Sequence, residues 1–570
     1  MLLGLREIYP SETETATSPE RFIHRRVEQS VADVGTRFAP RVSPVPLVDR
    51  YDTFVQTCLL RRSGDVTIGE HLEGNYAMTS PVTESVALPI PTSTAPSEVA
   101  VSSDRPVKLA RVLGFGSAIA LVVGGVIGSG IFVKPGNIAT QLGSFPAIFS
   151  VWVLGAVLCA LGGLCFSELA AMMPGAGGPY LYIRRAYGPL GGFLFGWTEV
   201  LFNRPATTGA LAVIFAQALT ALVGLELNLW GKGLCSVVII CFIAAVNIRG
   251  VIWGGFLQNA TTWIKVSFLA FVGFVPILIS IIGWSAIHVE NYSTSIPVSS
   301  EASFASRFSV ALLAVMWAYN GWHGVTPVAE EIKRPRRNVV RAILLGILII
   351  FGLYITANIT YHGVLSMDEV AASGEHTAEI VLAKVFGPIG SSAMAIVLMC
   401  STFGAINSDL LITPRVTFAM GRDGHISSRF GEVHPTYRTP VQAILTHAFL
   451  ASTLVIATTI VVAIAPQMKQ ESIFDLLTNF AIFASSIFYL LTVLAVPILR
   501  WREPKSRRPF RVWGYPIVPF LFVATYLWFL TQVYLARPFE SRMGLLFIAL
   551  GLPVYWWLQT RRSSRTHLSN

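Results

Sequence analysis

Charged residues are scarce in this sequence: Asp, Glu, Lys and Arg together make up 13%, against about 25% in soluble domains. So little charge excludes an ordinary soluble domain and indicates a chain that lies in lipid. The six cysteines show no metal-ligand spacing and five of them lie inside apolar stretches, so we expect neither a zinc site nor a disulfide framework. The pI is near 9.4, but the basic residues stand in short runs between apolar stretches. We therefore expect no nucleic-acid partner.

Recognisable catalytic motifs are also missing. An intramembrane enzyme would need a motif such as His-Glu-x-x-His or Gly-x-Ser-Gly within a span. Neither occurs, and the stretch nearest to the second motif has Ile127 where that motif needs glycine. We therefore expect a protein that is not an enzyme, with no catalytic residues, no cofactor and no metal.

The first 106 residues differ from the rest of the chain. They lack helical periodicity and end in a Pro/Ser/Thr-rich stretch at 89–97, which predicts a disordered cytoplasmic extension over 1–106. A misassigned start codon is the alternative. No apolar signal-peptide core follows Met1. Beyond the extension we predict a transmembrane transporter domain over 107–560 and a cytoplasmic tail over 561–570.

From residue 112 onward, apolar stretches of spanning length follow one another. A helix needs about 20 apolar residues to cross the hydrocarbon core of a bilayer. The sequence therefore predicts an all-α membrane protein with about twelve transmembrane helices, the two longest of which include interfacial turns. The predicted spans are 112–133, 146–172, 189–222, 230–248, 256–285, 307–330, 339–364, 379–416, 440–464, 472–499, 516–536 and 543–560.

Basic residues predict the orientation. If the N-terminus lies in the cytoplasm, the inside loops carry most of the loop Lys and Arg, including Arg184, Arg185 and the runs at 333–341 and 500–511. The loops on the other side carry few. The positive-inside rule then places both termini in the cytoplasm, with the chain in the plasma or inner membrane of the cell.

Two spans have centres that are poor helices. The first reads Val-Val-Gly-Gly-Val-Ile-Gly-Ser-Gly-Ile-Phe over 122–132, and glycine costs about 1 kcal/mol relative to alanine in a helix. The sixth reads Trp-Ala-Tyr-Asn-Gly-Trp-His-Gly over 317–324, with Pro327 one turn later. These spans hold matching positions if the chain consists of two five-helix halves followed by two further helices.

Broken helices in matching positions of an inverted 5+5 repeat indicate a substrate site near the middle of the membrane. At such breaks, N–H groups without partners face a carboxylate and carbonyl groups accept from an ammonium, the two charges that an α-amino acid carries. The alternative is that the glycines only allow close helix packing, which is the better interpretation of Gly124 alone. Breaks in both spans favour the binding site.

Several motifs follow one another in order along the chain: 126–135, 166–169, 173–178, 318–322 with Glu330 and Glu331, and 403–407 with Arg415 and 421–425. These motifs resemble those of the L-type amino acid transporters, a family of the amino acid–polyamine–organocation superfamily. The resemblance extends over about 112–500. It implies secondary active transport of amino acids by alternating access, in a fold of two inverted five-helix repeats (LeuT-like) with broken helices 1 and 6.

The resemblance also implies a set of substrate-binding residues. Backbone N–H groups of the first break would take the carboxylate, and carbonyls of the sixth span would take the amine. Trp317 would close over the substrate, although alone it is better interpreted as a lipid- or core-facing aromatic. Ser485 matches a polar position near the side-chain pocket. The set is Ile127, Gly128, Ser129, Gly130, Trp317, Ala318, Asn320 and Ser485.

Asn320 bears on selectivity. Members of the family that accept cationic amino acids carry an Asp at the matching place, whereas this side chain is neutral. A buried lysine or arginine head without a counter-charge is strongly disfavoured, so neutral substrates are favoured. The alternative is that Asn320 only caps backbone groups at the break.

Lys265 stands at least eight residues from either end of its span, where an ammonium is expensive and usually faces the interior. It matches a fifth-helix lysine of the family that substitutes for a sodium ion between the first and eighth helices. Ser401 and the carbonyls near Gly128 are the implied partners, and the implied transport is independent of sodium. Snorkelling of the lysine stem is the alternative.

Three other polar residues have plainer interpretations. We expect Glu168 and Glu199 at cytoplasmic span ends, in packing or gating pairs with Arg185 or Arg204. We expect His323 to be a satisfied interior histidine, with a proton relay as the less favoured alternative.

One departure from the family concerns partners. Members linked to a heavy subunit carry an external cysteine between the third and fourth spans, and the loop 223–228 has none. We therefore expect no disulfide-linked heavy subunit, and only an amino acid substrate and the lipid bilayer as partners. The predicted function is a sodium-independent exchanger or facilitator for neutral L-amino acids. The alternatives are a proton-coupled symporter for amino acids or polyamines, and a transporter-like nutrient sensor.

Overall fold

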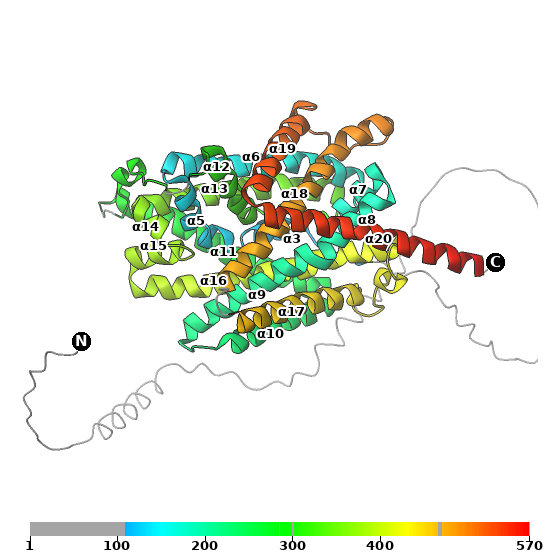
Figure 1. The fold of residues 1–570 in the computed structure, drawn as a ribbon, viewed down its shortest axis with the longest axis horizontal. Coiled ribbons are helices and arrows are strands. Elements are labelled where there is room, and N and C mark those ends of the chain that lie inside the picture. Colours follow the sequence, from blue (N-terminus) through cyan, green and yellow to red (C-terminus); the bar gives the residue numbers. More distant parts are fainter. Residues whose placement is uncertain (1–108, 284–285, 299–300, 466–469, 569–570) are drawn as a thin grey trace, which may run out of the picture. The chain divides into compact units, whose positions relative to one another are not determined.

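A computed structural model describes residues 109–283, 286–298, 301–465 and 470–568. The extension predicted over 1–106 lies outside these residues. Within the described part of the chain every regular element is a helix, as Figure 1 shows, and no strand is present. The prediction of an all-α protein is confirmed.

Eleven helices in the described ranges are long and apolar enough to span a membrane. The shorter apolar helix α12 occupies the place of the sixth predicted span. The segments are α3 (Phe115–Val126) with α4 (Gly130–Val133), α6 (Phe145–Met172), α8 (Pro189–Thr198) with the π-helical turn η2 (Glu199–Asn203) and α9 (Arg204–Val223), α10 (Leu229–Ile248), α11 (Val251–Ile281), α12 (Phe304–Ala318), α13 (Pro335–Val364), α16 (Pro388–Arg422), α17 (Val441–Ile464), α18 (Gln470–Arg502), α19 (Ile517–Ala536) and α20 (Pro538–Leu568).

Some boundaries differ from the prediction. The predicted span 379–416 is two helices, α15 (Thr377–Phe386) and α16, because Gly387 adopts a φ of 64° and Pro388 begins the next helix. This is an interfacial turn of the kind expected for the longest spans. At the other end of the chain, α20 continues to Leu568, so the predicted tail is helical over the residues that are described there.

Each of the first five spans has a counterpart among the next five, and counterparts make equivalent helix–helix contacts. Helix α3 packs on α11 and α13, and α12 packs correspondingly on α18 and α6. Helix α11 packs on α16, as α18 packs on α9. Figure 1 shows α9, α10 and α17 side by side, and all three contact one another. Because five spans are an odd number, the second set begins on the opposite face of the membrane, so the repeat is inverted.

The outer surface of the bundle is apolar. Large side chains on outward faces are well exposed, including Trp263 (73%) on α11, Phe449 (69%) on α17 and Phe520 (69%) on α19. Such faces suit lipid tails, because a soluble protein rarely exposes so many large apolar groups together. Polar groups are instead gathered in the interior, around the two breaks.

Candidate functional site

The first break lies between α3 and α4. The Ile127 N–H donates to the Val123 carbonyl (2.9 Å) and the Gly128 N–H to the Val126 carbonyl (2.7 Å), which ends α3. Residues 127–129 are not helical, and helix α4 begins at Gly130. The backbone N–H groups of Ser129, Gly130 and Ile131 therefore have no acceptor among the described residues.

The glycine at 130 is required by a close approach of the two broken helices. A Cβ atom added there would lie 2.5 Å from the Ala318 Cα at the end of α12, closer than two non-bonded carbons can stand. The start of α4 thus packs directly against the end of α12. The two breaks form one site.

The second break begins where α12 ends. The chain is irregular over 319–328 until the 3₁₀ turn η4 (Ala329–Glu331). Gly321 adopts a φ of 108°, which favours glycine, and a Cβ added there would lie 3.0 Å from the Gly125 carbonyl oxygen. The Tyr319 and Asn320 carbonyls accept no hydrogen bond from any residue that the structure describes. They are available to an ammonium.

One buried tyrosine joins the breaks. The Tyr354 hydroxyl of α13 lies 2.9 Å from the Ala318 carbonyl oxygen and 3.2 Å from the Val126 carbonyl oxygen. It therefore lies within hydrogen-bond distance of the last carbonyls of both α12 and α3, and its single proton is shared between them. Sequence reasoning did not single out Tyr354, because it is one tyrosine in an apolar span and belongs to no motif.

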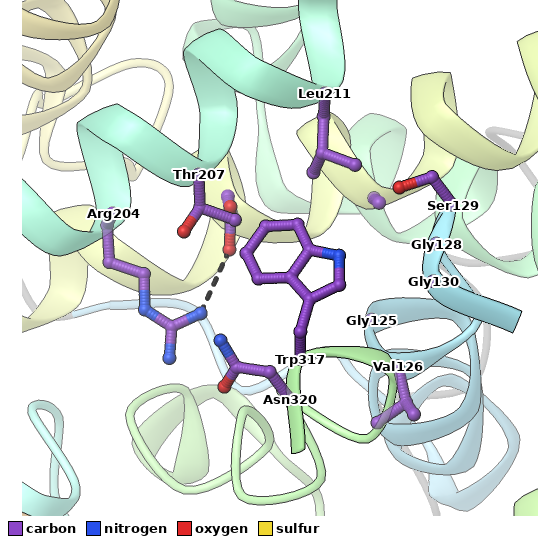
Figure 2. Close-up of a pocket in the computed structure, with 12 residues that line it drawn as sticks. Gly125, Val126, Gly128, Ser129, Gly130, Arg204, Thr207, Leu211, Trp317 and Asn320 are labelled. Atoms are coloured by element: carbon purple, nitrogen blue, oxygen red, sulfur yellow. Dashed lines mark hydrogen bonds and ion pairs between the residues drawn. The ribbon is translucent and has the colours of Figure 1, made fainter. Parts of the chain in front are cut away.

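A small cavity lies between the breaks and helices α9 and α16. Its volume is about 30 Å³, which corresponds to one or a few water molecules. Figure 2 shows the Trp317 indole pointing across it towards Leu211 and Thr207. An amino acid needs more room than this, so substrate entry requires Trp317 or its neighbours to move. The cavity is lined by Gly125, Val126, Gly128, Ser129, Gly130, Arg204, Thr207, Leu211, Trp317, Asn320, Ala405 and Asp409.

Lys265 and Ser401 hold the first break from the other side. Lys265 is completely buried, and its Nζ donates to the Gly124 carbonyl at 2.8 Å. The Ser401 hydroxyl lies 3.0 Å from the Ile127 carbonyl oxygen and 2.8 Å from that of Gly128. A cation at the carboxyl end of α3 is favoured by the helix dipole. Within the described residues, no hydrogen bond joins Lys265 directly to Ser401.

Ser485 lies away from the cavity. Its hydroxyl on α18 donates to Glu199 Oε1 at 3.1 Å and accepts from the Asn203 amide at 2.9 Å. The α18 residue that reaches the second break is Tyr489, whose hydroxyl donates to Asn320 Oδ1 at 2.9 Å. Sequence reasoning did not single out Tyr489.

The position predicted for Glu199 is wrong. It lies in the middle of the long helical segment Pro189–Val223 and is only 4% exposed. The π-helical turn at Glu199–Asn203 aligns residues five apart, and Arg204 Nε donates to Glu199 Oε2 at 2.9 Å. The expected pair with Arg204 therefore forms, but in the interior and beside the cavity. Pro205, which cannot donate a helical hydrogen bond, is the second residue after this turn.

Arg204 also binds residues from two other elements. Its Nη1 donates to Asp409 Oδ1 of α16 at 3.1 Å, the ion pair drawn as a dashed line in Figure 2. Its Nη2 lies 3.2 Å from His323 Nε2. His323 thus has an interior partner, as expected, but its Nδ1 has none in the described part of the chain.

Ion pairs also gather at one end of the bundle. Glu168, at the last turn of α6, pairs with Arg500 at 2.6 Å, so its predicted pairing with Arg185 is wrong. Arg185 instead pairs with Glu503 and, through that hydrogen bond, holds the pKa of Glu503 below its ordinary value. A third and fully buried pair joins Glu331 to Arg415 at 3.0 Å. These pairs connect α6, α7 (Pro179–Tyr187), η4, α16 and α18.

An all-helical membrane bundle with two facing broken helices belongs to the class of secondary transporters. Comparison with known proteins gives the family: residues 113–555 match the model of the family described as amino acid permease. The chain belongs to this family, within the amino acid–polyamine–organocation superfamily, and is an amino acid transporter and not an enzyme.

Individual relatives cover the same region. The serine/threonine exchanger SteT of Bacillus subtilis (strain 168) is 31% identical over 461 residues, which are 80% of this chain and 98% of the relative. The large neutral amino acids transporter small subunit 2 of Mus musculus is 30% identical over 81% of this chain and 84% of its own length. The b(0,+)-type amino acid transporter 1 of Homo sapiens is 28% identical over 80% of this chain and 90% of its own length.

Proposed function

We propose that this chain exchanges neutral L-amino acids across the membrane without sodium. The observation that carries the proposal is the contact of Lys265 Nζ with the Gly124 carbonyl at 2.8 Å, in the completely buried interior. A cation fixed at this carbonyl supplies the positive charge that a bound sodium ion would otherwise supply at the end of α3. A buried ammonium is expensive, so its placement at the first break indicates a role there.

The two breaks hold the substrate backbone. The N–H groups of Ser129 and Gly130, with that of Ile131, take the carboxylate, because they lack acceptors among the described residues. The carbonyls at Tyr319 and Asn320 take the amine. Ile127 and Gly128 act through the carbonyls that bind Ser401, since their own N–H groups are already bonded within α3. Ala318 lets the two breaks approach, and Trp317 closes over the substrate.

Selectivity for neutral substrates is proposed from Asn320. Its amide supplies no counter-charge for a cationic side chain, and Tyr489 holds its oxygen. Ser485 acts behind the pocket, by binding Glu199. Relatives named for serine, threonine and large neutral amino acids support the same substrate class.

The orientation in the membrane, the boundaries of the segments and the absence of a heavy subunit are also part of the proposal. The basic loops predict that both termini face the cytoplasm from the plasma or inner membrane. Residues 1–106 would be an extension, 107–560 the transporter and 561–570 the tail. The nearest cysteine to the loop 223–228 is Cys235, within α10, which supports a chain that works without a disulfide-linked heavy subunit.

Purified protein in liposomes tests the proposal. Internal unlabelled serine or leucine should accelerate uptake of the labelled amino acid equally in sodium and in choline buffer. Arginine should compete poorly with native protein and about tenfold better with Asn320→Asp, because a new buried carboxylate pairs with the cationic side chain. A requirement for sodium, or preferred uptake of arginine by the native protein, would contradict the proposal.

A further inference from the structure

A strongly basic loop joins α18 to α19. Residues 500–516, which we call the basic loop and which include the last turn of α18, contain six Arg or Lys and a single acidic residue, Glu503. Because one spanning helix ends here and the next begins, the loop lies at a surface of the membrane. The site between the two breaks uses none of these charges.

One side of the basic loop is folded onto a buried carboxylate. Glu168 of α6 accepts from the Arg500 guanidinium at 2.6 Å and 2.9 Å, and from the Val512 N–H at 2.7 Å. Arg508 lies 3.5 Å from the same carboxylate and donates to three backbone carbonyls nearby. These contacts fix the backbone of the loop against α6.

Three other basic side chains of the loop have no counter-charge. Lys505, Arg507 and Arg511 are exposed and form no ion pair within the part of the chain that the structure describes. Glu503, the one acidic residue of the loop, is already paired with Arg185. The orientation of a membrane protein depends on how many basic residues a loop carries and does not require them to be fixed in place. Three like charges fixed within seven residues repel one another, so an anion from outside the chain would stabilise them.

Large exposed aromatic side chains lie on both sides of these cations in the sequence. Trp501 is 81% exposed and Trp513 is 66% exposed. Tryptophan is enriched where a membrane meets water, because its ring is apolar and its N–H is polar. The adjoining start of α19 exposes Ile517 (63%) and Phe520 (69%), which suit lipid tails. The basic loop therefore presents cations beside groups that contact lipid.

We propose that the basic loop binds the headgroup of an anionic phospholipid. The guanidinium groups of Arg507 and Arg511 can each donate two parallel hydrogen bonds to phosphate oxygens, and Lys505 adds a third cation. A zwitterionic phospholipid carries its own ammonium, which these cations repel. An acidic protein segment would supply negative charge but would leave the tryptophans and the apolar start of α19 uncovered, so a lipid fits this surface better. By offsetting the repulsion among the exposed cations, the bound headgroup stabilises the fold of the loop on Glu168.

Thermal unfolding of the purified protein in an uncharged detergent tests the site. Short-chain phosphatidylglycerol should raise the melting temperature, whereas phosphatidylcholine with the same chains should not. Lys505→Gln, Arg507→Gln and Arg511→Gln should each raise the phosphatidylglycerol concentration at half-maximal effect about fivefold, the factor that one basic residue contributes near an anionic lipid. Their melting temperatures without lipid should stay native, because the three side chains are exposed and form no ion pair among the described residues. Arg429→Gln, at an exposed position of η5 (Ser428–Gly431), is the matched control and should keep the native concentration.

Several outcomes would overturn the lipid site. Equal effects of the two phospholipids would do so, as would native phosphatidylglycerol concentrations at half-maximal effect in all three loop variants. The same fivefold rise in Arg429→Gln would show a diffuse effect of charge in place of a site. If polyglutamate or inorganic phosphate raised the melting temperature as much as phosphatidylglycerol, the ligand would not be a lipid. Failure of amino acid counterflow would contradict the proposed function, whereas the melting temperatures alone decide the lipid site.

Discussion

The two breaks occupy equivalent places in the internal repeat and share Tyr354, which reaches a backbone carbonyl of each. The helices that are equivalent in the repeat nevertheless hold the two breaks by different kinds of contact. At the first break, Lys265 of α11 and Ser401 of α16 bind backbone carbonyls at the end of α3. At the second break, the equivalent helices α18 and α9 bind side chains instead. Tyr489 reaches the amide of Asn320, and Arg204 reaches the ring of His323.

This difference indicates which contacts at the breaks are the same in any sequence and which depend on the side chains. Backbone carbonyls are present whatever side chains a sequence carries, so a break held through them suits the carboxylate end that every amino acid shares. A break held through side chains changes whenever those side chains change. We infer that the first break sets general binding and that the second sets selectivity.

The largest effect is expected from Lys265→Ala. It removes the cation at the Gly124 carbonyl, and a hydrogen bond to a charged group contributes about 1.5–3 kcal/mol. Serine counterflow should therefore fall by roughly tenfold to 100-fold, for every amino acid alike. Lys384→Ala, which removes a half-exposed lysine paired with Glu369, should transport at the native rate. Native-like counterflow in Lys265→Ala would show that the first break needs no cation.

An intermediate effect is expected from Gly130→Ala. The added Cβ would meet the Ala318 Cα at 2.5 Å, and overpacking of this kind costs about 1–3 kcal/mol. The two breaks should separate, with about a tenfold loss of uptake and a lower melting temperature in detergent. Gly116→Ala in α3 is the matched control, because nothing lies within 4 Å of the new Cβ. Equal behaviour of the two variants would contradict direct packing of the breaks.

Hydropathy and glycine content predicted much of the fold and the position of the site. Spans follow from apolar length, and the breaks from residues that are poor helix formers, such as Gly128 and Gly130. The pair of Glu199 with Arg204 was expected, but its place in the interior beside the cavity was missed, because a π-helical turn is invisible in the sequence. In a regular helix Glu199 and Arg204 would point in different directions, and only the wider turn brings them together. Asp409 was missed because it joins them from α16, more than 200 residues away.

The backbone N–H groups at the first break show a further limit of prediction from the sequence. The resemblance assigned four N–H groups to the carboxylate, starting at Ile127. In the structure the N–H groups of Ile127 and Gly128 are already bonded to carbonyls at the end of α3, those of Val123 and Val126. The exact residue at which a helix ends depends on competing hydrogen bonds from distant side chains such as Ser401 and Tyr354. Such contacts cannot be inferred from local sequence.

The smallest effect is expected from Tyr489→Phe, and it tests the contrast between the breaks most directly. The variant loses one hydrogen bond to Asn320 Oδ1, which contributes about 1 kcal/mol, or roughly fivefold in KM. Because the second break sets selectivity, this change should differ between serine, alanine and leucine. Ser401→Ala loses hydrogen bonds to the first break and should shift KM by a similar factor for all three. If Tyr489→Phe shifts the three KM values equally, or Ser401→Ala shifts them unequally, the division of roles between the breaks is wrong.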